Sequence, residues 1–78
     1  MEVFIKIEFG DPKTLVVIVE ADDTINMVKG IMKNMEGIPK HEQILKFADE
    51  TLEDDSTLTE NGIVDGSTIT LVILTKFE

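Results

Sequence analysis

The residues that could do chemistry in this chain are few and poorly placed for it. His41 is the only histidine, and it follows Pro39 and Lys40 in a predicted loop. Its spacing suggests no serine partner, and the chain has no cysteine. The adjacent carboxylates Asp54 and Asp55 also fall in a predicted surface loop. A catalytic nucleophile needs a base within hydrogen-bond reach, so we predict a protein that is not an enzyme and that needs no cofactor or metal.

The composition indicates a small acidic domain. Its 78 residues carry 16 acidic and 7 basic side chains, for a formal net charge of −9. Such a surface argues against nucleic acid, which proteins bind by neutralising phosphates, and against anionic membranes. No apolar run approaches the roughly 18 residues that a membrane span needs, and no signal peptide is recognisable. We expect a cytoplasmic or nuclear protein that is monomeric as an isolated domain and binds other proteins.

One predicted helix, between Thr24 and Pro39, organises the other elements. Four apolar side chains recur at helical spacing and therefore share one face: Ile25, Val28, Met32 and Met35. Thr24 is suited to cap the first turn. Gly37 can adopt the positive φ that ends a helix, and Pro39 prevents the helix from resuming.

The remaining segments alternate like strands that bury one face. Strands are predicted over residues 1–8, 14–20, 43–47 and 68–74. Thr57 and Glu60 have the spacing of a capping box, which predicts a short 3₁₀ turn before the last strand. The order strand-strand-helix-strand-turn-strand predicts an α+β fold, in which a mixed sheet of four to five strands packs on one helix.

This order, and many residues within it, resemble the ubiquitin family. The matching segments are MEVFIK at 1–6, DTI and VK within 23–29, EGIP at 36–39, FA at 47–48, LED at 52–54, TL at 57–58, ST at 67–68 and LV at 71–72. Their spacing matches that of the family, except that the first hairpin turn is longer. The ordered set identifies residues 1–78 as a single ubiquitin-like β-grasp domain.

The resemblance implies roles for several residues outside the sheet. Lys29 should be buried and paired with Asp54, and Gly66 should occupy a left-handed position. Asn61 replaces a tyrosine whose hydroxyl braces a loop, so we expect that brace to be lost.

The departures from the family pattern bear on function. Conjugated members end in two glycines whose carboxylate is activated, and Phe77 and Glu78 occupy those positions here. Glu50 and Asp65 stand where the two best-known linkage lysines would be. Because Phe77 and Glu78 replace the two glycines, we expect a domain that is not conjugated.

The recognition face implied by the resemblance is also altered. Family receptors dock on a small apolar patch whose central isoleucine is replaced by Lys46. Ile44 and Leu74 each replace an arginine, which shifts the apolar centre. We predict a partner-binding surface made of Ile44, Lys46, Thr70, Val72 and Leu74. A second outward apolar surface is predicted on the first hairpin and consists of Phe4, Val16 and Ile18. Of these three positions, ubiquitin keeps only the phenylalanine apolar.

The sequence thus predicts a non-conjugating ubiquitin-like interaction domain. Because Met1 opens the first strand directly, we expect it to be the N-terminal module of a larger adaptor in the ubiquitin–proteasome pathway. Its partner would be a ubiquitin-pathway receptor, a proteasome subunit or a sister domain. Two alternatives stay open: a structural module of a tandem ubiquitin-like protein, and an acidic β-grasp module that pairs with a basic one.

Overall fold

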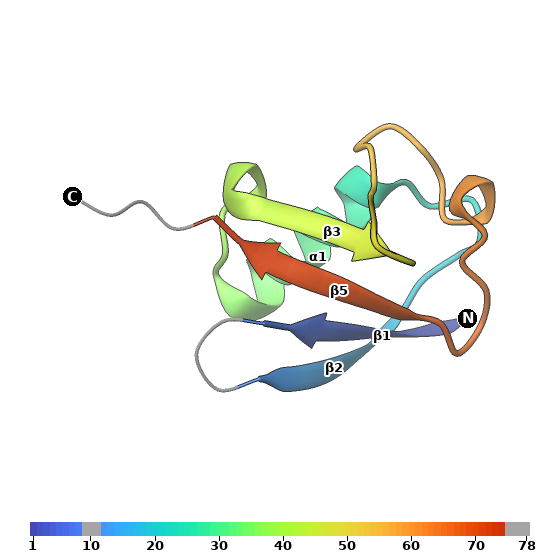
Figure 1. The fold of residues 1–78 in the computed structure, drawn as a ribbon. Coiled ribbons are helices and arrows are strands. Elements are labelled where there is room, and N and C mark those ends of the chain that lie inside the picture. The colour runs from blue at the N-terminus through green and yellow to red at the C-terminus, as the bar shows by residue number, and fades with distance from the viewer. Residues whose placement is uncertain (9–11, 75–78) are drawn as a thin grey trace.

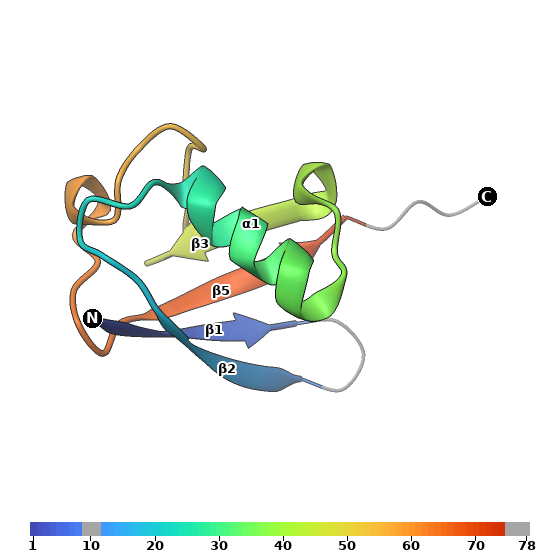
Figure 2. The ribbon, with the colours of Figure 1, turned by 180° about the vertical axis from the view of Figure 1, so that it is seen from behind.

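In the part of the chain that the structure describes, a mixed sheet of five strands is crossed on one face by one α-helix (Figures 1 and 2). This computed structural model describes residues 1–8 and 12–74. The elements in chain order are β1 (Glu2–Ile7), β2 (Lys13–Ile18), α1 (Ile25–Glu36), the 3₁₀ helix η1 (Lys40–Glu42), β3 (Gln43–Phe47), β4 (Glu50–Thr51), the 3₁₀ helix η2 (Thr59–Asn61) and β5 (Thr68–Ile73). The predicted α+β fold is confirmed.

The strands lie in the order β2-β1-β5-β3-β4. β1 and β5, the first and last strands of the chain, pair in parallel at the centre. β2 pairs antiparallel with β1, and β3 pairs antiparallel with β5 and with β4. The sheet therefore has two edges, the six-residue strand β2 and the two-residue strand β4.

Strict alternation along the strands explains why one face of the sheet is the core. Val3 and Ile5 of β1, like Ile69 and Leu71 of β5, are completely buried, and the residues between them are not. Side chains on a strand point alternately to its two faces, so these four buried side chains all lie on the face of the sheet that packs against α1. Leu45 of β3 is also fully buried there.

The helix begins and ends as its sequence predicts. The Thr24 hydroxyl accepts a hydrogen bond from the Met27 N–H at 3.3 Å. Gly37 follows the last turn with φ 73°, and its N–H donates to the Lys33 carbonyl. The helix N-terminus also rests on the 54–56 loop, because the N–H groups of Ile25 and Asn26 donate to carbonyls of that loop.

One part of the helical prediction was wrong: Met35 is 51% exposed and does not belong to the core. The buried residues of α1 are Ile25, Val28, Lys29 and Met32. Because Lys29 belongs to this set, the centre of the buried stripe lies closer to Lys29 than the apolar residues alone predict. At about 100° of rotation per residue, Met35 falls on the flank of that stripe.

The segment between β3 and β5 confirms the predicted capping box but differs from the prediction at Asn61. The capping box forms: Glu60 N–H donates to the Thr57 hydroxyl, and Thr57 N–H donates to a Glu60 carboxylate oxygen. The expected loss of a brace at Asn61 was incomplete, because the Asn61 amide donates to the Ser56 hydroxyl and the Thr57 carbonyl. Gly66 has φ 86°, as the left-handed position requires.

Candidate partner-binding surface

The face of the sheet opposite α1, which we call the outer face, displays the residues predicted to bind partners. On this face Ile44 of β3 lies opposite Val72 of β5, and Lys46 lies opposite Thr70. The parallel register of β1 and β5 then places Lys6 beside Thr70. Pairing of three strands thus brings residues far apart in the sequence onto one continuous surface.

Ile44, Val72 and Leu74 form an apolar group at one corner of this face, which we call the shifted patch. Ile44 and Val72 are directly opposite each other on antiparallel strands and both are half-buried. Leu74, 48% exposed, continues the same alternation, and its N–H donates to the Glu42 carbonyl at 2.7 Å. That hydrogen bond extends the strand pairing beyond Ile73. The three side chains are therefore held by the ladder between β3 and β5.

Lys46 borders the shifted patch and is half-buried. Its neighbours across the strands are Thr70 and Thr51, and it lines a shallow hollow of about 320 Å³ with Glu8 and Asp49. Within the described part of the chain no carboxylate oxygen comes within 4.0 Å of its ammonium. The lysine therefore presents a positive charge next to apolar surface.

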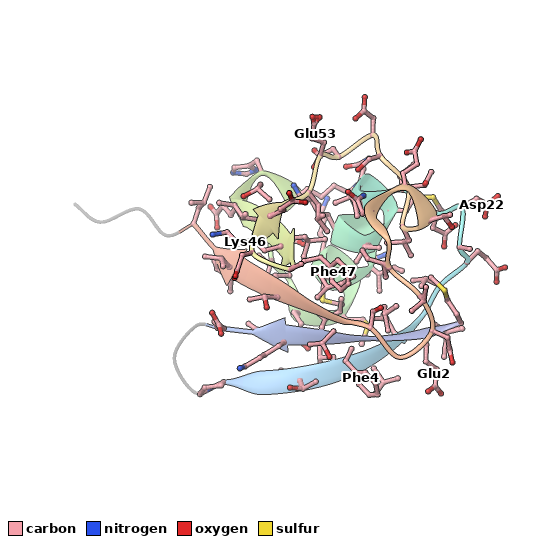
Figure 3. The ribbon with its side chains drawn as sticks, turned by 45° about the vertical axis from the view of Figure 1, so that its right-hand side comes forward. Glu2, Phe4, Asp22, Lys46, Phe47 and Glu53 are labelled. Carbon is pink, nitrogen blue, oxygen red and sulfur yellow. The ribbon has the colours of Figure 1, made fainter. Side chains whose placement is uncertain are left out.

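Phe4, Val16 and Ile18, the hairpin cluster, lie at the opposite corner. Phe4 of β1 is half-buried and lies opposite Val16 of β2. Val16 is 50% exposed and Ile18 is 66% exposed. Figure 3 shows Phe4 and Lys46 at separate places along the same side of the sheet. The hairpin cluster and the shifted patch are thus two distinct apolar surfaces.

A polar row separates these two surfaces. It consists of Thr14, Lys6, Thr70 and Lys46, which are neighbours on four successive strands. Lys6 was not among the predicted site residues. Its outward position could be read from the alternation of β1, but its place beside Thr70 depends on the parallel pairing with β5, for which the sequence holds no local signal.

Lys29 and Asp54 lie away from the outer face and connect α1 to the loop after β4. The Lys29 ammonium is 2.6 Å from an Asp54 carboxylate oxygen. The lysine side chain is only 10% exposed, whereas the aspartate side chain is 59% exposed. Nearby, the buried Gln43 amide donates to the carbonyls of Lys29 and Ile38. The pair therefore joins a buried cation to a carboxylate that still contacts water.

The two positions that lack linkage lysines are occupied by exposed carboxylates with different surroundings. Glu50 begins β4, just after a turn in which Ala48 and Asp49 both have positive φ. Asp65 accepts a hydrogen bond from the Glu2 N–H at 2.7 Å. Asp65 therefore stabilises the start of β1.

The remaining chemical candidates form no site. His41 is exposed in η1, and its imidazole lies 3.7 Å from the Glu42 carboxylate. Among the residues that the structure describes, no three metal-ligating side chains gather. The same residues include no helix long and apolar enough to cross a membrane. Phe77 and Glu78 lie outside the described residues.

Comparison with known proteins is consistent with this architecture. Residues 3–76 match the model of a family described as the ubiquitin family. A protein of Dictyostelium discoideum named ubiquitin-like protein NEDD8-like protein 2 is 46% identical over 50 residues. The match covers 64% of this chain and 62% of that relative, so it spans less than two thirds of the relative's length.

Proposed function

Because the chain belongs to the ubiquitin family, we propose that it is a ubiquitin-like interaction domain that binds protein partners through the outer face of its sheet and is not itself conjugated. Ubiquitin-like domains generally mediate protein–protein contacts and are generally not enzymes. The functional question is therefore which surface binds and what kind of partner it accepts.

The observation that carries the proposal is the shifted patch. Ile44 and Val72 form a cross-strand pair, and Leu74 extends it, so the apolar surface is contiguous. Scattered exposed apolar side chains are common and carry no functional meaning, but a contiguous group on paired strands favours a docking role. A partner that covers this group would remove apolar area from water, which is worth roughly 25 cal/mol per Å².

Lys46 sets the specificity of this surface. A receptor that places apolar side chains over the Lys46 position would have to bury an unpaired ammonium, which costs several kcal/mol. The long stem of lysine can carry its charge to the rim of a contact, and this lessens the penalty. The proposed partner therefore covers Ile44, Val72 and Leu74 while leaving the Lys46 ammonium hydrated or paired with a carboxylate.

The proposal that the domain is not conjugated depends on two residues of the sequence. Phe77 and Glu78 occupy the positions of the terminal glycines. A tail that threads narrow enzyme channels needs the bare backbone that only glycine supplies, and a phenylalanine side chain would block such a channel.

We place the domain in an adaptor of the ubiquitin–proteasome pathway, acting in the cytoplasm or nucleus as a module of a larger protein.

A modifier is the second candidate function. It is favoured by the relative from Dictyostelium discoideum, whose name marks it as a NEDD8-like ubiquitin-like protein. A modifier must be activated at its C-terminus, whereas an interaction domain need not be. Activation therefore separates the two functions.

The test is a charging reaction with ubiquitin-activating enzyme and ATP, followed on a non-reducing gel. We expect no thioester with the natural chain and a thioester with ubiquitin as the positive control. A variant carrying Phe77→Gly and Glu78→Gly separates the effect of the tail from recognition of the folded domain. A thioester formed by the natural chain would overturn the proposal and favour the modifier.

A further inference from the structure

The two edges of the sheet are protected to very different degrees. β4 is two residues long, begins with Glu50 and follows directly on a tight turn. β2 is six residues long, KTLVVI, and its register with β1 runs without a bulge from Lys13 to Ile18. Natural edges are usually guarded by charge, proline, bulges or short length. β2 has one of these guards, the charged Lys13 at its start, and none from Thr14 to Ile18.

The hydrogen-bond parity of β2 shows which of its groups are free. The N–H and C=O of Val19 are both bonded to Met1, at 2.8 and 2.7 Å. In an antiparallel ladder such doubly bonded pairs alternate with unbonded ones, so Val17, Leu15 and Lys13 also turn their backbone groups toward β1. Thr14, Val16 and Ile18 therefore turn theirs toward the open edge.

The three residues whose backbone groups face the open edge also have exposed side chains. Val16 is 50% exposed and Ile18 is 66% exposed, and both lie on the outer face. The segment TLVVIV at 14–19 combines high β-propensity, no charge and no proline, which is typical of strands that pair with copies of themselves. The open edge ends at Glu20, because the Glu20 N–H donates to the Asp23 carboxylate of the same chain.

We propose that β2 pairs antiparallel with β2 of a second copy of this chain, about a two-fold axis at Val16. In this register Val16 faces Val16 of the second copy, and Thr14 faces Ile18. Every free N–H and C=O of the three residues then finds a partner, and the two sheets become one. Registers shifted by a single residue fail, because they oppose free groups to groups already bonded to β1 and place outer side chains on the inner face.

The outer side chains fit the same register. On the outer face the row Phe4–Val16 of one copy continues into Val16–Phe4 of the second, so the two hairpin clusters merge into one apolar surface. The charged residues that flank this segment are Lys13 and Glu20. Lys13 already pairs with Glu36 of its own chain, at 2.8 Å between ammonium and carboxylate oxygen, so the flanking charges play no part in the contact between copies.

The association should be weak and should strengthen with salt. A contact between two edge strands falls well below the roughly 1,200 Å² of a standard stable interface. Each copy also carries a net charge of −9, and the resulting repulsion is screened as ionic strength rises. The chain should be monomeric at low micromolar concentration and dimeric near millimolar concentration. This contact uses the hairpin cluster and is independent of partner binding at the shifted patch.

The test is a dilution series of the full chain followed by NMR, from about 1 mM to about 20 µM, at low and high salt. We expect concentration-dependent shifts centred on residues 14–18, and slower hydrogen exchange of the Thr14, Val16 and Ile18 amides at high concentration. Val16→Lys should weaken dimerisation at least about tenfold, because it places two ammonium groups face to face at the axis. Val64→Lys is the matched control, since Val64 is 63% exposed and lies outside the strands of the sheet.

Several results would overturn the proposal. The first is no concentration dependence up to millimolar at either salt level. The second is an equal loss of association in Val16→Lys and Val64→Lys. Shifts centred on the shifted patch, or on the hairpin cluster without protection of the three edge amides, would indicate face-to-face contact or another occupant instead of strand pairing.

Discussion

The two faces of this sheet are built from the same strands, yet different requirements govern them. On the inner face Val3, Leu45 and Leu71 are completely buried against α1. On the outer face the neighbouring residues, such as Ile44 and Val72, are half-buried and share the surface with two lysines. Close packing limits what an inner position can hold. An outer position has no such limit, so its residue can change while the fold is kept.

Among truncations, the largest expected effect is on the inner face. Leu45→Ala should lower the free energy of unfolding by about 2–5 kcal/mol, because it removes buried methyl groups and leaves a cavity. Ile44→Ala, on the next residue of β3, is the matched outer-face control and should cost much less. Urea denaturation with an unchanged m-value would measure both variants. Equal losses would show that the two faces are not distinct.

Lys29 tests whether a charged residue can belong to the buried set. Lys29→Ala should lower the free energy of unfolding by about 2–3 kcal/mol, because it empties space beside α1 and breaks a contact to Asp54. Lys46→Ala is the control on the outer face. Since Asp54 is 59% exposed on its side chain, water can solvate the carboxylate left behind, and most of the loss should come from packing. A loss at Lys29 no larger than at Lys46 would contradict this.

The smallest expected effect on stability is at Lys46 itself. Lys46→Ile should change the free energy of unfolding by no more than about 0.5 kcal/mol, as is usual for surface positions. The reverse exchange on the inner face, Leu45→Lys, should prevent folding because it buries an unpaired charge. Circular dichroism and thermal denaturation distinguish the two variants. A large stability change at Lys46 would mean that the outer face is also constrained by packing.

Periodicity predicted the inner face well, because burial repeats along the chain at the periods of strand and helix. The capping box of Thr57 and Glu60 could be read for the same reason: its contacts are local. The prediction for Met35 was wrong because a buried lysine shifts the stripe of α1, and lysine is read as polar. The strand β4 is too short to leave a pattern.

The outer face was harder to predict because its neighbourhoods depend on pairing between distant strands. Alternation indicated which side chains point outward, and the family resemblance indicated a β-grasp fold. The contact between Lys6 and Thr70 follows only from the parallel register of β1 and β5. The amide contacts of Asn61 depend on how a loop closes, which no periodicity describes.

The most direct test of the account is an NMR titration with a small ubiquitin-binding helix, comparing the natural domain with Lys46→Ile. We expect the natural domain to bind tens of fold or more weakly than ubiquitin. Contact at Lys46 would bury an ammonium, which costs several kcal/mol, against about 1.5–3 kcal/mol for the apolar burial it replaces. Lys46→Ile should bind at least about tenfold more tightly, with shifts at Ile44, Val72 and Leu74. Tight binding by the natural domain, centred on Lys46, would contradict the shifted patch.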